Sequence, residues 1–350
     1  MEPETPVEWL RHGQALEAHN TAESVDGAVR SYGKAVALLR ALPIEQVRRE
    51  LAIASMNLGN ARQKQMDATA HVDAVRAYDD AIALLSAINA PEDFALRNSI
   101  GAAWMNRGHA LHRQGKAGAI AAALESHDHA IAQLQSLPLG ENRSFLINLA
   151  AAWMNRAHAL LSFEFPDSVA AHEAALKTIQ LTSDGMHADP VIADVSLRAR
   201  HALCGALSQQ LSKKATAELI AETGDIVDES LALVRHWEKQ GGQHFRPLAL
   251  AIFRFGTQFY HAYQPQFLAE FILESVDPKG STGALFESDE LRAIALSTLA
   301  RARADVYNRS MFDPADRRLQ ELRQDLEEAE KRLTEVQAQN RQPSKSGTIS

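Results

Sequence analysis

Cysteine is almost missing from this 350-residue sequence, which contains only Cys204. A single cysteine cannot form an internal disulfide, so a disulfide-stapled scaffold is excluded. Long hydrophobic runs are missing too: no stretch of about 18 apolar residues occurs, so no transmembrane helix is predicted. The acidic N-terminal residues contain no apolar signal core. Together these absences predict a cytoplasmic protein that does not bind a membrane.

Positive charge is in short supply, because 36 Lys and Arg stand against 44 Asp and Glu and the net charge is −8. This balance disfavours nucleic acid or an anionic membrane as the main partner. The sequence also contains no phosphate-binding glycine loop, no His-Glu-x-x-His and no Gly-x-Ser-x-Gly. We therefore expect a non-enzymatic protein with no metal site and no cofactor.

The most informative feature that is present is an internal repeat. A seven-residue block occurs at 55–61, 104–110 and 153–159, and its asparagine stands at positions 57, 106 and 155, two steps of 49 residues. A fixed period of this size is typical of stacked helix pairs. Apolar residues form 46 % of the chain, and proline and glycine are confined mainly to the expected turns, which favours helices.

Each repeat is predicted to contain two helices. The first carries the Met-Asn block, and the second carries a small-x-x-x-ring-x-x-small pattern, as in Ala28, Tyr32 and Ala35. Spacings of four and three place these residues on one stripe of a helix. A small residue on the first helix, such as Gly13, lets the two helices approach, and the ring fills the gap beside their crossing. The rings expected in the core are Tyr32, Tyr78, His127 and His172.

This pattern resembles the tetratricopeptide repeat (TPR). The best copy matches its signature positions with Trp104, Gly108, Ala110, Ala123, His127 and Ala130. The likeness covers four units over residues 7–183 and is weak beyond them. The units here have 46 to 49 residues, whereas the family repeat has about 34, so the chain is similar to longer-repeat relatives. The resemblance implies an all-α, right-handed α-solenoid of about seven antiparallel helix pairs.

The rest of the chain is expected to follow from this array. We predict an N-terminal tail at 1–6, a TPR-like domain at 7–312, a charged helix at 313–340 and a disordered tail at 341–350. The charged helix has an apolar heptad stripe, which consists of Leu319, Leu322, Leu326, Ala329, Leu333 and Val336. This stripe is short for a free-standing coiled coil. It predicts a helix that caps the solenoid, and the alternative is a homodimer that associates through it.

Asn57, Asn106 and Asn155 occupy the same place in successive units, and we call them the asparagine ladder. The TPR resemblance implies that the first helices line the concave face, where such asparagines bind the backbone of an extended peptide. A carboxamide carries a donor and an acceptor, so it can pair with a peptide N–H and C=O together. In the alternative interpretation, these side chains hydrogen-bond between neighbouring helices and only fix their register.

Other polar residues extend the predicted peptide-binding face. Arg11 and Arg198 take the ladder position in the first and fifth units, and arginine suits the carboxylates of an acidic segment. Polar side chains three residues beyond the ladder include Asn60, His109 and His158. The sequence thus predicts a protein–protein interaction module that binds an extended protein or peptide segment.

Two hypotheses from other classes remain open. The protein is an assembly factor that associates through its C-terminal helix, or it is an α-helical enzyme with a pocket near 245–271, where aromatic residues gather. The enzyme hypothesis requires titratable side chains beside those rings. Cys204, three residues after His201, is a conceivable nucleophile, but a small buried residue is the favoured interpretation.

Overall fold

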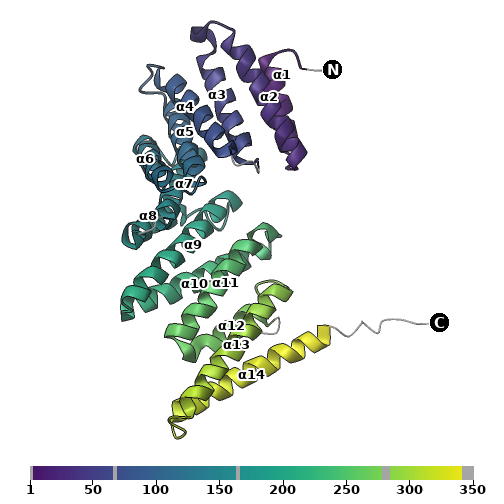
Figure 1. Cartoon of the computed structure of the whole chain (residues 1–350), viewed down its shortest axis with the longest axis vertical. Coiled ribbons are helices and arrows are strands. Elements are labelled where there is room, and N and C mark those ends of the chain that lie inside the picture. Colours follow the sequence, from purple (N-terminus) through teal and green to yellow (C-terminus); the bar gives the residue numbers. More distant parts are fainter. Residues whose placement is uncertain (1–2, 66–68, 163–165, 278–283, 341–350) are drawn as a thin grey trace, which may run out of the picture. The chain divides into compact units, whose positions relative to one another are not determined.

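The computed structural model describes residues 3–65, 69–162, 166–277 and 284–340 (Figure 1). These residues form fourteen α-helices and one short 3-10 helix, and the described part contains no β-strand. The chain is therefore all-α, as predicted. None of the described helices combines the length and the hydropathy that a membrane crossing requires. The tail expected at 341–350 lies outside the described residues.

The chain divides into two compact units, Met1–Ser183 and Asp184–Ser350. The boundary coincides with the end of the four regular repeats expected at 7–183, and each of these repeats supplies one helix pair. The helices of the first unit are α1 (Pro6–Glu17), α2 (Ala22–Arg40), α3 (Ile44–Gln63), α4 (Ala70–Ser86), α5 (Phe94–His112), α6 (Ala117–Leu134), α7 (Arg143–Leu161) and α8 (Ser168–Thr182).

Neighbouring helices of the first unit pack in the order of the chain, as in an α-solenoid. Each first helix packs on its own second helix, and each second helix packs on the next first helix. In addition, α5 packs directly on α7 and α3 contacts α5, whereas no two of the second helices α2, α4, α6 and α8 share a comparable contact. The first helices α3, α5 and α7 therefore form the more tightly spaced inner side of the unit. We call this side, together with the equivalent helix α1, the inner face.

Small residues and rings meet at the helix crossings, as the pattern predicts. A Cβ atom on Gly59 of α3 would lie only 2.7 Å from the ring of Tyr78 on α4, which is fully buried. In the next repeat, a Cβ on Gly108 would lie 2.5 Å from the ring of His127, which is also fully buried. Close approach of the two helices, not backbone conformation, therefore requires glycine at these places.

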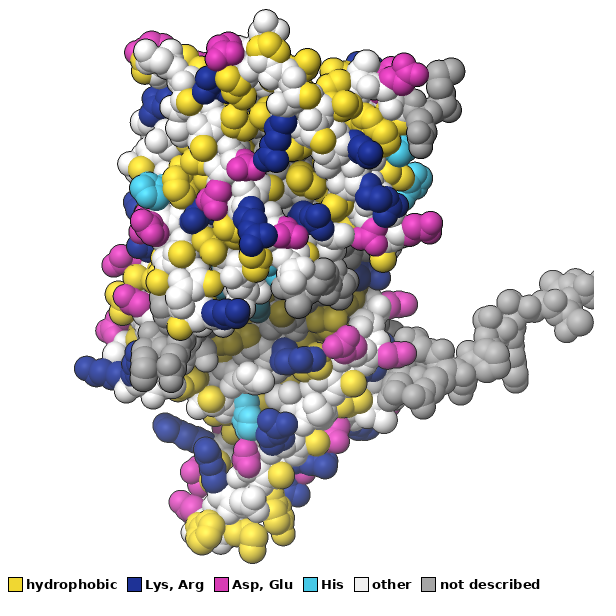
Figure 2. Space-filling model, turned by 45° about the horizontal axis from the view of Figure 1, so that its top comes forward, with side chains coloured by type: hydrophobic (Ala, Val, Ile, Leu, Met, Phe, Trp, Pro, Cys, Tyr) yellow, Lys and Arg dark blue, Asp and Glu magenta, His cyan; other side chains and the backbone are white. Residues whose placement is uncertain are grey.

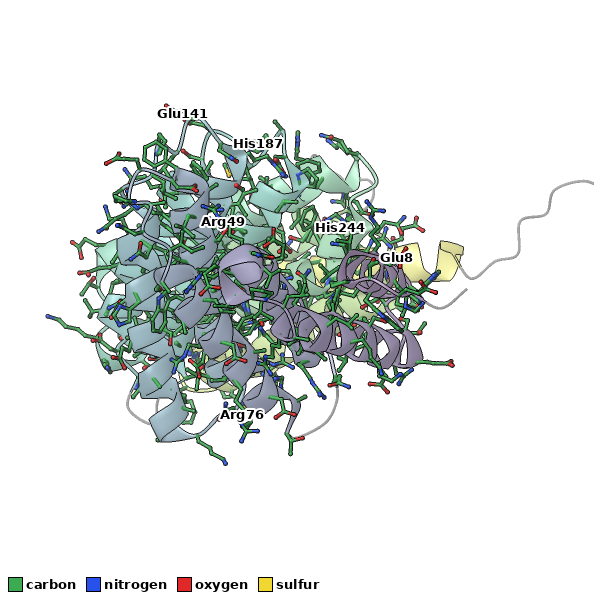
Figure 3. All side chains as sticks on the ribbon, turned by 90° about the horizontal axis from the view of Figure 1, so that it is seen from above. Glu8, Arg49, Arg76, Glu141, His187 and His244 are labelled. Carbon is green, nitrogen blue, oxygen red and sulfur yellow. The ribbon has the colours of Figure 1, made fainter. Side chains whose placement is uncertain are left out.

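Ion pairs connect successive repeats at the surface. Arg49 on α3, labelled in Figure 3, contacts Asp93 at 2.5 Å, and the Asp93 side chain also caps the N-terminus of α5. The Arg49 side chain and the backbone N–H of Leu96 hold the pKa of this carboxyl below its usual range. Asp93 thus links α3 to the first turn of α5.

The second unit continues the pairwise packing with less regular repeats. Its helices are α9 (Pro190–Lys213), α10 (Ala217–Glu238), the 3-10 helix η1 (Gln243–Phe245), α11 (Arg246–Tyr263), α12 (Pro265–Val276), α13 (Asp289–Ser310) and α14 (Arg317–Asn340). The pairs α9 and α10, α11 and α12, and α13 and α14 each pack together, and α10 and α13 also contact α11. The described helices of the chain thus make seven successive pairs.

The C-terminal helix α14 turns its apolar stripe inward, onto α12 and α13. Leu326, Ala329 and Leu333 are fully buried there. Arg332 on α14 contacts the buried carboxylate of Asp277, at the end of α12, at 2.5 Å. These three residues of the stripe are therefore covered within the same chain, as in a capping helix, and association of two chains through them would require α14 to leave this position. The side chain of Val336 lies outside the described part.

Candidate functional site

The asparagine ladder lies on three consecutive first helices of the first unit, α3, α5 and α7. Asn57, Asn106 and Asn155 are all partly exposed, and none of them is sealed in the core. Asn60, His109 and His158 follow one turn later on the same helix faces, and they are also partly exposed. The structure thus brings six of the predicted residues together on the inner face of one unit.

Asn106, in the middle of the ladder, is held by the neighbouring repeat. Its Nδ2 donates to Asn60 Oδ1 at 3.1 Å, and the same oxygen accepts from the Tyr78 hydroxyl at 2.7 Å. Gln63 Nε2 donates to the backbone oxygen of Asn106 at 3.3 Å. At this position the contacts agree with the alternative interpretation, in which the asparagine carboxamide fixes the register of adjacent helices.

The two outer members of the ladder differ from Asn106. Within the described residues, the carboxamides of Asn57 and Asn155 have no hydrogen-bond partner. Both are partly exposed, so water satisfies their donors and acceptors until another group replaces it. These two side chains, and not the whole ladder, can bind an external backbone without first breaking a contact inside the protein.

The arginines expected beside the ladder take different places. Arg11 is exposed on α1, at the ladder position of the first repeat. Arg198 is part of α9 in the second unit, where its Nε donates to Asp194 Oδ2 at 2.7 Å. The first unit by itself therefore presents the ladder with Arg11.

Apolar side chains accompany the ladder one turn towards the N-terminus of each first helix. Val7 on α1 and Ile53 on α3 are 53 % and 50 % exposed. The equivalent places on α5 and α7 hold the small residues Ala102 and Ala151, which are partly exposed. The inner face therefore combines carboxamides with exposed apolar surface.

Arginines next to the repeated block have structural partners, as expected for salt-bridged side chains. Arg107 Nε contacts Asp79 Oδ1 at 2.6 Å and Arg156 Nε contacts Asp128 Oδ1 at 2.7 Å, so the same pair forms in two successive repeats. Arg107 also lies over the ring of Trp104, 5.4 Å from its centroid. Figure 2 accordingly shows charges of both signs interspersed with hydrophobic side chains on the face it draws.

One inter-repeat contact was not predicted from the sequence. Asn148 Nδ2 on α7 donates to Asn98 Oδ1 on α5 at 2.9 Å. The two positions differ by 50 residues, one more than the repeat step, so they do not align with each other in the repeat. A pair offset from the period in this way is visible only once the helices are packed.

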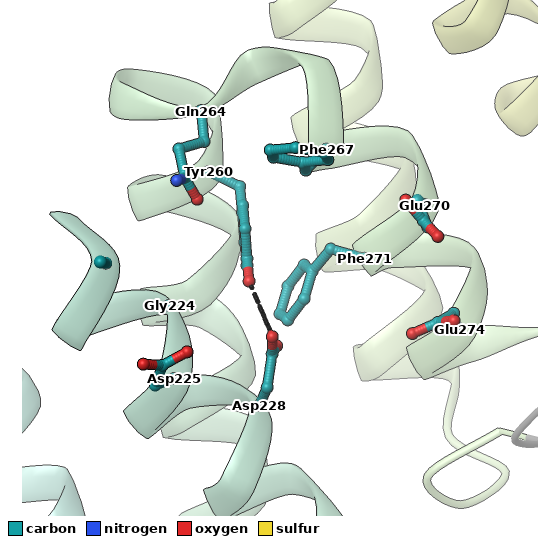
Figure 4. Close-up of a pocket in the computed structure, with 10 residues that line it drawn as sticks. Gly224, Asp225, Asp228, Tyr260, Gln264, Phe267, Glu270, Phe271 and Glu274 are labelled. Carbon is teal, nitrogen blue, oxygen red and sulfur yellow. Dashed lines mark hydrogen bonds between the residues drawn. The ribbon is translucent and has the colours of Figure 1, made fainter. Parts of the chain in front are cut away.

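A second candidate lies in the second unit, where α10, α11 and α12 surround a hollow of about 430 Å³ (Figure 4). Three aromatic residues from the stretch 245–271 line it, so aromatic side chains of that stretch do border a pocket. Four carboxylates, which the sequence analysis missed, line it as well. The titratable and aromatic lining residues are Asp225, Asp228, Tyr260, Phe267, Glu270, Phe271 and Glu274.

A sequence signal for these carboxylates exists in the helix periodicity. Asp225 and Asp228 are three residues apart on α10, and Glu270 and Glu274 are four apart on α12, so each pair shares one helix face. The Tyr260 hydroxyl donates to Asp228 at 3.1 Å. Burial raises the pKa of Asp228, and this hydrogen bond opposes the rise, while burial and the nearby carboxylate raise the pKa of Tyr260. Tyr260 therefore stays a protonated donor.

Other chemistry considered from the sequence finds little support in the side chains. Cys204 is buried, and this burial raises the pKa of its thiol to about 12, so the nucleophilic thiolate is scarcely populated at neutral pH. His201, by contrast, is exposed. No three His, Cys, Asp or Glu side chains of the described residues gather in an arrangement that could hold a metal ion.

No protein-family model matches the chain, and no curated protein matches its sequence. The relation to the tetratricopeptide repeat is therefore a resemblance in sequence pattern and in helix pairing.

Proposed function

We propose that this protein is a non-enzymatic interaction module that binds an extended protein segment along the inner face of its first unit. The observation that carries the proposal is the pair Asn57 and Asn155, which are partly exposed at equivalent positions and have no partner in the described structure. Packed helices lie about 8–10 Å apart, and an extended chain advances about 3.3 Å per residue. Successive repeats would thus meet about every third residue of the ligand.

The chemistry of the inner face suits an extended backbone. Asn57 and Asn155 each offer a donor and an acceptor to a peptide group. Ile53 offers exposed apolar surface to a ligand side chain, and Arg11 offers a guanidinium to an acidic or C-terminal group at one end. We therefore propose a ligand segment with an apolar residue and, near it, a carboxylate.

The two other classes of function are less well supported. Association through the C-terminal stripe competes with the packing of Leu326, Ala329 and Leu333 inside the same chain. The enzyme hypothesis does find titratable groups beside the aromatic residues of 245–271, as it required. However, the Tyr260 hydroxyl donates its hydrogen bond to Asp228 and so is not free for a substrate. The Cys204 thiol is buried. An interaction module is therefore the function that we propose.

A peptide-display selection tests this proposal directly. A library of random twelve-residue peptides is selected on the full-length protein, and enriched peptides are measured by fluorescence anisotropy. In the double variant Asn57→Ala/Asn155→Ala, the loss of two water-exchanged hydrogen-bonding groups should cost about 1–3 kcal/mol of binding energy, roughly 5- to 150-fold in Kd. Its thermal unfolding should match the wild type, because neither side chain has a partner to lose.

A matched control separates a specific face from general loss of asparagine. Asn89 is an exposed asparagine in the turn after α4, and Asn89→Ala should leave the affinity within about twofold. The variant Asn60→Ala should instead lower stability, because Asn60 accepts from both Asn106 and Tyr78. If the double variant binds the selected peptides as tightly as the wild type, or if no peptide is enriched, the proposal is wrong.

A further inference from the structure

The hollow between α10, α11 and α12 belongs to the second unit and plays no part in the peptide-binding proposal. Figure 4 shows the rings of Phe267 and Phe271 projecting from α12 into the space that Asp225 and Asp228 of α10 border. Phe267 is 46 % exposed, although most other rings of this region are packed in the core. An exposed ring beside carboxylates offers a face on which a cation can stack.

The walls of the hollow carry unbalanced negative charge. Asp225 and Glu270 are exposed and form no ion pair among the described residues. The nearby cation is Arg235, whose Nη2 donates to the backbone oxygen of Glu274 at 3.0 Å. Burial lowers the pKa of Arg235, and the Glu274 and Asp228 carboxylates oppose that effect. Arg235 balances one of the four carboxylates, so the hollow remains acidic.

The aromatic side of the hollow is preorganised. The rings of Tyr260 and Phe271 lie 4.5 Å apart between centroids, and the Tyr260 hydroxyl is fixed by its hydrogen bonds to Asp228. These contacts leave Phe267 as the ring with free surface. A positive group near an aromatic face gains energy from the ring quadrupole, more so when it is partly desolvated.

Gly224 keeps the floor of the hollow open. A Cβ atom added there would lie 3.7 Å from the Tyr260 hydroxyl and 3.8 Å from Gln264 Oε1, which are ordinary contacts. Packing therefore does not require glycine at this place in the middle of α10, unlike at the close crossing of Gly256, where a Cβ would lie 2.5 Å from the Phe271 ring. Glycine in a helix interior lowers stability by about 0.5–1 kcal/mol, and here it leaves room for a ligand.

The acidic surface continues past α12. Glu270 and Glu274 also border a second hollow of about 490 Å³, whose other wall is α14 with Asp325 and Glu328. Arg332 lies at its edge, and its guanidinium is already paired with Asp277. A segment anchored in the first hollow would thus meet more carboxylates as it leaves, and a basic segment fits this continuation best.

We infer that the hollow lined by Asp225, Phe267 and Glu270 binds an arginine side chain of a basic protein segment. Arginine fits better than lysine, because its planar guanidinium can stack on a ring and pair with a carboxylate at the same time. A metal ion fits poorly, since the carboxylates lie on separate helices and no three of the described ones gather around one point.

The test uses full-length protein and a fluorescein-labelled peptide, Gly-Gly-Arg-Arg-Gly-Gly. The neutral citrulline peptide of the same shape and the lysine peptide serve as reference ligands. We expect saturable binding of the arginine peptide and none of the citrulline peptide, with the lysine peptide at least threefold weaker. The variant Asp225→Asn/Glu270→Gln should weaken arginine binding at least tenfold, and Phe267→Ala at least fivefold.

The matched control removes the same charge elsewhere in the second unit. Glu287 and Asp313 are exposed and lie outside both hollows, so Glu287→Gln/Asp313→Asn should keep the affinity within twofold. Circular dichroism melting should be unchanged for both charge variants, because all four side chains are exposed. The inference is overturned if the arginine peptide shows no saturable binding, if the two double variants weaken it equally, or if the citrulline or lysine peptide binds as tightly.

Discussion

The glycines at the helix crossings lead to a specific prediction. Alanine usually makes a helix more stable than glycine does, and at these crossings the effect should have the opposite sign. Replacing an interior helical glycine by alanine normally stabilises a protein by about 0.5–1 kcal/mol. At Gly59 the new methyl group would lie 2.7 Å from Tyr78 Cε1 and 2.8 Å from Cζ. Gly33 on α2 has no atom within 4 Å of the equivalent position, so it provides a matched control in the same unit.

The loss of stability expected for Gly59→Ala can be worked out from the interactions that the Tyr78 ring would lose. Its hydroxyl donates to Asn60 at 2.7 Å and accepts from Gln63 at 2.6 Å, and the ring is fully buried. If the ring moves, these hydrogen bonds weaken, at about 0.5–1.5 kcal/mol each. If the helices separate instead, overpacking costs about 1–3 kcal/mol. Gly59→Ala should therefore lower stability by about 1–2 kcal/mol net, while Gly33→Ala should raise it by about 0.5–1 kcal/mol.

Native-state hydrogen exchange, read by mass spectrometry on α2, α3 and α4, measures both changes in the first unit separately from the second. Repeat arrays do not always unfold in one step, so a local measure is preferable to a single melting temperature. In the double variant Gly59→Ala/Tyr78→Leu, the two losses should be less than additive, because leucine leaves room for the methyl group. If Gly59→Ala increases protection as Gly33→Ala does, the reasoning about these crossings is refuted.

Two further predictions concern a buried histidine and the C-terminal helix. Burial lowers the pKa of His127 to about 3, whereas the pKa of a histidine in the unfolded chain is about 6.5. Between these values the unfolded chain binds a proton that the folded unit does not. As the pH is lowered between those values, the free energy of unfolding of the first unit should fall by up to about 1.4 kcal/mol per pH unit. In urea unfolding, the His127→Leu variant should show a weaker dependence of the unfolding free energy on pH than the wild type. The same dependence in both proteins would contradict the prediction. Arg332→Ala should reduce exchange protection of α12 by about 1–3 kcal/mol, since Asp277 is buried; the exposed control Lys331→Ala should not, and equal effects would count against the pairing.

The repeat made the first unit predictable in some detail. The close crossings of Gly13, Gly59 and Gly108 with the buried rings of Tyr32, Tyr78 and His127 followed from a period that occurs several times. The ring expected in the fourth repeat, His172, is only partly buried. The ion pairs of Arg107 with Asp79 and of Arg156 with Asp128 have the same separation in sequence. Such contacts can be found by aligning the repeats, because equivalent residues in a regular array have equivalent neighbours.

The hollow of the second unit was only half predictable. The aromatic residues between 245 and 271 stood out by composition. The four carboxylates lie in pairs on α10 and α12, and each pair looks like an ordinary solvated helix face. Which helix covers which is not fixed by a repeat in this part of the chain. Only the packed structure therefore shows that these carboxylates and Phe267 line the same hollow.

The asparagine ladder shows why equivalent positions need not have equivalent roles. Asn106 contacts Asn60, which lies one turn after the ladder position on the preceding first helix and accepts its hydrogen bond. For Asn155 the corresponding residue is His109, and for Asn57 it is Gln14, which is exposed. The same residue at equivalent positions thus closes a contact between repeats at Asn106, whereas the carboxamides of Asn57 and Asn155 have no hydrogen-bond partner within the described residues. A functional reading of any repeat position has to include the residue that it faces in the next layer.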